Sequence, residues 1–90
     1  MTDTEQQLID DGIAARLFLE SEAGQRIKER MGRTTYNEWR LAKTTNEREQ
    51  AWARSEAFNR LFDEMQTTSE KGENAKLQRE RREKVAAQRS

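Results

Sequence analysis

Two stretches of this 90-residue sequence carry apolar side chains at the spacing of an α-helix, and a polar break at residues 43–46 separates them. Steps of four and three residues place the members of each stretch on one side of a helix. The first set is Ile27, Met31, Thr35, Trp39 and Ala42, and the second is Ala51, Ser55, Phe58, Phe62 and Met65. The pattern predicts an all-α fold built on an antiparallel helical hairpin of the coiled-coil type.

Capping signals predict helices over about residues 4–20, 22–42 and 46–68, which together form one helical domain, 1–68. The capping-box spacing, Thr followed three residues later by Glu or Gln, begins at Thr2, Thr4 and Thr44. Ser21 is a good N-cap for the second helix. Gly12 interrupts the first helix at a cost of about 1 kcal/mol relative to alanine, which suggests that another element packs closely there.

The sequence changes character after Thr68. Residues 69–74 are polar and contain Gly72, a residue that often ends helices, so this segment is predicted to be a linker. Residues 75–90 are rich in helix formers but polar on all sides, which predicts a basic, mobile C-terminal tail that is a fraying helix or disordered.

Composition excludes several classes of function. The chain has no cysteine and no histidine, so thiolate metal sites, disulfides and Ser/His or Cys nucleophile arrangements are not available. Asp10-Asp11 and Asp63-Glu64 have no spacing that requires a metal. We therefore predict no enzyme, no cofactor and no metal site. The chain begins without a basic and apolar leader and has no stretch long enough to cross a membrane, which predicts a soluble, cytoplasmic protein.

The formal net charge of zero hides an uneven distribution. Residues 1–24 hold six acidic side chains against one arginine, and residues 75–90 hold six basic side chains against two glutamates. Five of these basic side chains, with Arg40, could contact an anion or a nucleic acid; the five are Lys76, Arg79, Arg81, Arg82 and Lys84. A small nucleic-acid-associated regulator is therefore the alternative function, although no aromatic residue is interleaved for base stacking.

A core of about sixty residues is small, and the first helix is apolar around much of its circumference. A second copy or another protein would cover the surplus apolar surface. We predict that Leu8, Leu19, Tyr36 and Trp52 make this contact, with Arg26, Arg30 and Arg33 as its polar rim. The alternatives are that the aromatic residues belong to the core and that the arginine row is an ordinary solvated face.

Three short patterns carry a family resemblance: residues 17–23 (LFLESEA), Tyr36-x-x-Trp39, and residues 47–52 (Glu-Arg-Glu-x-x-Trp). Over residues 8–66 the chain resembles a loose group of short helical proteins encoded by tailed bacteriophages. It departs from the group at Gly24, where a bulky apolar residue is usual. The resemblance implies a non-enzymatic accessory or virion assembly protein that acts through protein contacts in the host cytoplasm or the virion, or inhibits a host protein. It identifies no active residue.

Overall fold

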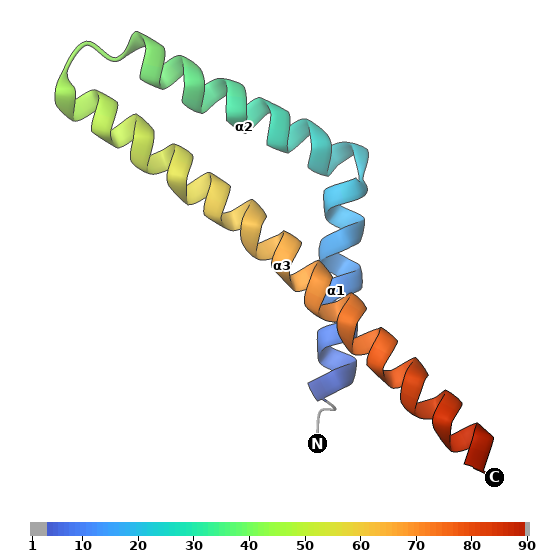
Figure 1. Cartoon of the computed structure of the whole chain (residues 1–90). Coiled ribbons are helices and arrows are strands. Elements are labelled where there is room, and N and C mark those ends of the chain that lie inside the picture. The colour runs from blue at the N-terminus through green and yellow to red at the C-terminus, as the bar shows by residue number, and fades with distance from the viewer. Residues whose placement is uncertain (1–3, 90) are drawn as a thin grey trace.

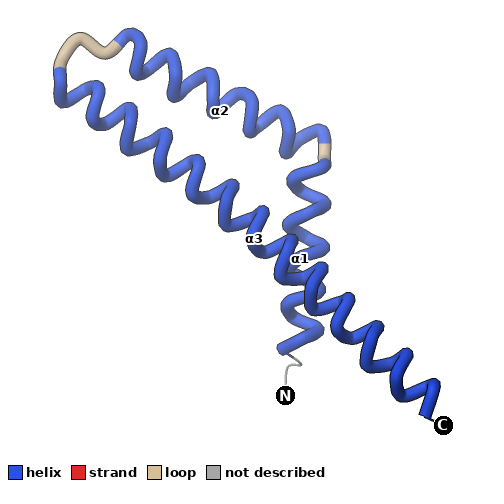
Figure 2. The backbone as a smooth tube through the Cα atoms, viewed as in Figure 1, coloured by secondary structure: helices blue, strands red, loops and turns tan. Residues whose placement is uncertain are grey.

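The computed structural model describes residues 4–89, which form three helices and, within this range, no strand. Helix α1 spans Thr4–Glu20, α2 spans Glu22–Leu41 and α3 spans Thr45–Arg89 (Figures 1 and 2). The prediction of an all-α protein is confirmed. The molecule is elongated, with extents of 70 × 24 × 22 Å and a radius of gyration of 19.3 Å. A globular chain of this length would have a radius of gyration of about 12 Å.

The chain turns sharply between α1 and α2 at Ser21 (Figure 1). Ser21 is extended, with φ −67° and ψ 153°, and its side-chain oxygen accepts a hydrogen bond from the backbone N–H of Gly24 at 2.9 Å. The same hydroxyl donates to the carbonyl oxygen of Phe18 at 2.7 Å. A Cβ atom at Gly24 would lie only 1.8 Å from that carbonyl oxygen, so the corner has room for glycine alone.

A second turn joins α2 to α3 and uses the capping box predicted at Thr44. The backbone N–H of Glu47 donates to Thr44 Oγ1 at 3.1 Å, and Glu47 Oε2 accepts from the backbone N–H of Lys43 at 2.8 Å. From this turn α2 and the first part of α3 run in opposite directions beside each other (Figure 1). Ala51 and Thr35 are buried between them, and Arg54 of α3 pairs with Glu38 of α2 at 2.6 Å.

Helix α3 continues without a break through residues 69–74, where the sequence pattern predicted a linker, and through residues 75–89, where it predicted a fraying or disordered tail. Gly72 does not adopt the positive φ of a helix C-cap. The segment has strong helix formers and the chain has no proline, so nothing forces an end. Helix α1 also lies across α3 here. The last residue, 90, is outside the described range.

The crossing of α1 and α3 brings the two backbones into contact. A Cβ atom added to Gly12 would lie 2.7 Å from the Cα of Gly72, and one added to Gly72 would lie 2.7 Å from the Cα of Gly12. Ile9 and Ala75 are buried beside this contact. The mid-helix glycine of α1 thus marks a close approach, as expected, and the partner at this approach is the residue predicted to end α3.

The small core lies along α3. Phe62 contacts Phe18 of α1 with ring centroids 6.5 Å apart and Phe58 of α3 with centroids 4.7 Å apart. The ammonium group of Lys28 on α2 lies 5.8 Å from the Phe62 ring centroid, so one aromatic side chain joins all three helices. Among the described residues, no large side chain is completely buried.

Candidate protein-interaction surface

A groove of about 370 Å³ lies between α2 and α3 near the turn that joins them. None of the side chains that line it is charged, although 38% of the residues in the chain are charged. Interfaces between proteins have the same depletion of charge at their centres and are rich in tryptophan and tyrosine. The lining residues are Gly32, Thr35, Tyr36, Trp39, Ala51, Trp52, Ser55, Phe58 and Asn59. We call this surface the aromatic groove.

The three largest side chains of the aromatic groove are mostly exposed to water. Trp39 is 52% exposed, Tyr36 is 61% exposed and Trp52 is 62% exposed. Thr35, at the floor, is 7% exposed, and its hydroxyl is satisfied locally by the carbonyl oxygen of Met31 at 2.9 Å. The groove therefore presents aromatic rings over a floor that has no unsatisfied hydroxyl.

Two further hollows adjoin the aromatic groove and share residues with it. One shares Gly32 and Tyr36 with it and runs along α2 past Lys28, Glu29 and Arg33. The other shares Asn59 and continues to Asp63 and Phe62. The border of the groove thus carries two basic and two acidic side chains, which are Lys28, Arg33, Glu29 and Asp63.

The residues predicted to contact a partner are divided between separate places. Tyr36 and Trp52 meet in the aromatic groove. Leu19 is half-buried in the adjoining hollow beside Phe62, whereas Leu8 lies on α1 next to the Gly72 crossing and is 40% exposed. The structure does not bring Leu8 into one surface with the other three.

The predicted arginine rim is also divided. Arg33 borders the aromatic groove, and Arg30 and Arg40 are exposed on α2. Arg26 forms an ion pair with Glu22 one turn earlier in the same helix. Helical spacing predicts Trp39 in the helix seam and gives no contact for Gly32, whereas both line the groove. The sequence signal for the groove is that Trp39 and Trp52 flank the same turn.

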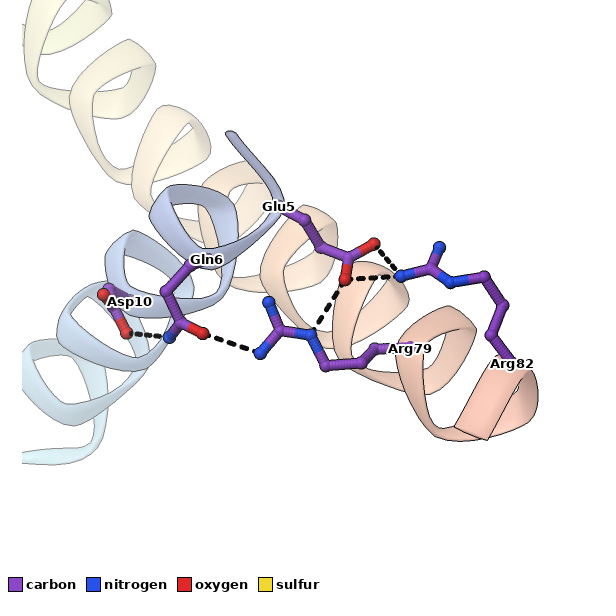
Figure 3. Close-up of polar contacts among 5 residues, drawn as sticks. All are labelled: Glu5, Gln6, Asp10, Arg79 and Arg82. Carbon is purple, nitrogen blue, oxygen red and sulfur yellow. Dashed lines mark hydrogen bonds and ion pairs between the residues drawn. The ribbon is translucent and has the colours of Figure 1, made fainter. Parts of the chain in front are cut away.

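Two basic side chains of the predicted tail form hydrogen bonds and ion pairs with side chains of α1 (Figure 3). Arg79 Nε donates to Glu5 Oε1 at 2.8 Å, and Arg82 donates to both oxygens of the same carboxylate at 2.5 Å. Arg79 also donates to the side-chain oxygen of Gln6 at 2.6 Å, and Gln6 donates to Asp10 at 2.8 Å. The hydrogen bonds from Arg82 and then Arg79 lower the pKa of Glu5 below its ordinary value.

The other basic residues of the C-terminal part of α3 have no common partner group. Lys76 lies near the α1–α3 crossing, in a small hollow shared with Arg16 and Glu73, whose charged groups are 3.8 Å apart. Arg81, Arg82 and Arg89 border a shallow surface with Val85 and Ala86 close to the end of the helix, and Lys84 is exposed. The basic residues of this part of α3 thus lie in different surroundings, and a contact with an anion stays a prediction.

Within residues 4–89, no three acidic side chains are grouped so that they could hold a metal ion. The helices of this part of the chain have no stretch that is long and apolar enough to cross a membrane. Comparison of the chain with family models, with curated proteins and with solved structures gives no match.

Proposed function

We propose that this chain is a non-enzymatic protein-interaction module and that it self-associates. The observation that carries the proposal is its accessible surface of 7434 Å². A folded monomer of this mass is expected to expose about 5,500 Å². The excess, roughly 1,900 Å², is more than the ~800 Å² that each partner contributes to a standard protein interface.

The apolar part of this surface lies on all three helices. Besides the groove aromatics, large apolar side chains remain at least 36% exposed; they are Leu8, Ile13, Leu17, Phe18, Ile27, Met31, Leu41, Leu61, Leu77 and Val85. Single exposed apolar residues are ordinary, but so many on so small a chain leave much of the available hydrophobic free energy unused. Association with another protein surface would remove part of this apolar area from water.

The resemblance to helical phage proteins supports a narrower form of the same proposal, an accessory or assembly protein that docks on a larger structure. This narrower proposal is supported by the sequence pattern around Tyr36, Trp39 and Trp52. The alternative of a nucleic-acid-associated regulator is less well supported, because Arg79 and Arg82 are engaged by Glu5. Inhibition of a host protein would use the same contact surface as association.

Sedimentation equilibrium of the purified chain over a wide concentration range tests the proposal. We expect the average mass to rise from that of a monomer, 10.6 kDa, to at least twice that value. The rise should persist at high salt, because the contact is chiefly apolar. A monomer mass at every concentration would contradict self-association. A shift of DNA or RNA that declines steeply with salt would favour the regulator instead.

A further inference from the structure

We propose that the aromatic groove binds a second copy of this chain, so that two α2–α3 pairs lie face to face around a two-fold axis, with their corresponding helices in opposite directions. This inference rests on the self-association proposed above and specifies its surface, its occupant and its orientation.

The four glycines of the chain differ in what surrounds them. Added Cβ atoms at Gly12, Gly24 and Gly72 would each collide with backbone atoms of the same chain. At Gly32 an added Cβ atom would have nothing within 4 Å. Glycine within a helix costs about 1 kcal/mol relative to alanine, and nothing in the single chain compensates for this cost at Gly32. A second chain that packs closely on the groove would explain why glycine is present at this position.

Large side chains line the aromatic groove on both sides of its middle, and the gap among them is at Gly32. Trp39 and Trp52 lie near the α2–α3 turn, whereas Gly32, Phe58 and Asn59 lie farther from it along the two helices. If a second copy is placed antiparallel, its Trp39 faces Gly32 of the first copy and its Trp52 faces Phe58 and Asn59. In a two-fold interface the reverse contact also forms, so both ends are filled. The axis then passes near Thr35 and Ser55.

The charges at the border favour a second copy over a partner of one charge. Lys28 and Arg33 oppose Glu29 and Asp63, so the border is neutral in sum. A strongly acidic or strongly basic partner would find equal numbers of like and unlike charges, whereas a second copy, whose own border is also neutral in sum, meets no net repulsion there. The excess surface of roughly 1,900 Å² per chain is also sufficient for a stable dimer.

The test compares Gly32→Leu with Asn37→Leu, two substitutions that add the same side chain to exposed positions of α2. Asn37 is five residues later and therefore about 140° round the helix, away from the groove. The Cβ atom of a leucine at position 32 has nothing within 4 Å in its own chain, and the rest of the side chain would occupy the groove and obstruct a second copy. We expect Gly32→Leu to raise the dimer Kd by about tenfold or more and Asn37→Leu to leave it near that of the wild type. Far-UV circular dichroism checks that both variants keep their helix content.

A cross-linking experiment tests the orientation, because the chain has no cysteine of its own. Residues near a two-fold axis face their own counterparts. Ser55→Cys should therefore oxidise to a covalent dimer far faster than Ala53→Cys, which is exposed on the opposite side of α3.

A wild-type chain that remains monomeric would reject the proposed function as a whole. A wild-type chain that associates while Gly32→Leu keeps the same Kd would reject only the groove as its interface. Equal cross-linking at positions 53 and 55 would reject the antiparallel two-fold arrangement.

Discussion

At the crossing of α1 and α3 two helix backbones touch, whereas along the α2–α3 pair large aromatic side chains stand in water. The crossing combines two glycines, two buried apolar residues and the ion pairs of Glu5. The α2–α3 pair buries chiefly Thr35 and Ala51, and leaves Trp39 and Trp52 more than half exposed. The α1–α3 contact is buried within one chain, whereas the α2–α3 pair leaves its aromatic side chains exposed to water.

This difference indicates how two helix contacts in one small chain can serve different purposes. Small residues at the crossing allow close packing without a large core, and hydrogen bonds between charged side chains add specificity. Aromatic residues in an open groove contribute little to the stability of the monomer but can contribute strongly once a partner excludes water. The following experiments separate the two contacts, beginning with the largest expected effect.

Phe62→Ala should have the largest effect on stability, because its ring contacts both Phe18 and Phe58. We expect the free energy of unfolding to fall by about 3 kcal/mol, as is usual when a buried phenylalanine is truncated. Urea denaturation monitored by circular dichroism measures the change. Leu61→Ala is the control, because Leu61 is adjacent but 57% exposed. If both variants lost the same free energy of unfolding, Phe62 would not be the residue that connects α1 and α2 to α3.

Glycine-to-alanine substitutions should have opposite signs at the two contacts. Gly12→Ala places a methyl group against the backbone of α3 and should destabilise the chain by about 2 kcal/mol. Gly32→Ala meets no atom and should stabilise α2 by up to about 1 kcal/mol. Thermal unfolding at a concentration low enough to keep the chain monomeric gives both values. Stabilisation by both substitutions would mean that the α1–α3 backbones are not in contact.

Trp52→Ala should weaken self-association by about 1–2 kcal/mol, or roughly tenfold in Kd, while changing the stability of the monomer little. Leu61→Ala provides a matched control, since Leu61 is similarly exposed on the same helix but does not line the groove. Light scattering over a dilution series measures both variants. A mass unchanged by Trp52→Ala would assign the association to a different surface.

The smallest expected effect concerns Glu5, whose pKa is lowered by Arg82 and Arg79. Its contribution to stability is therefore complete above the ordinary glutamate pKa of about 4.3 and is lost as the pH falls through the lower pKa of the folded chain. Wild type should lose more stability than Glu5→Gln between neutral and acidic pH, because the variant lacks this titration. Thermal unfolding at both pH values measures the difference, and identical losses would contradict the pairing.

Local signals in the sequence predicted the helical class of the structure and several of its details. The capping box at Thr44 and the N-cap at Ser21 depend on neighbours within three residues, so their pattern could be recognised directly. The burial of Ala51 and Phe62 followed from helical spacing alone. Tyr36 and Trp52 lie together in the groove, and their contact with a partner stays a prediction.

Interactions between distant residues were not predictable in the same way. Glycine is common where helices end, and the sequence contained no sign that Gly72 instead lies against Gly12, sixty residues earlier. Likewise, the pairing of Arg79 and Arg82 with Glu5 joins residues more than seventy positions apart. Without that contact, the polar C-terminal segment has no evident reason to stay helical, which is why it was predicted to fray.

The crossing has a practical consequence for anyone who shortens this protein. A fragment that stops at Thr68, where the composition changes, would retain all of α1 but lose Gly72, Ala75, Arg79 and Arg82. Helix α1 would then have no backbone to lie against and no cation for Glu5. The final quarter of the sequence is thus the surface against which the first helix packs, and removing it would loosen the opposite end of the chain.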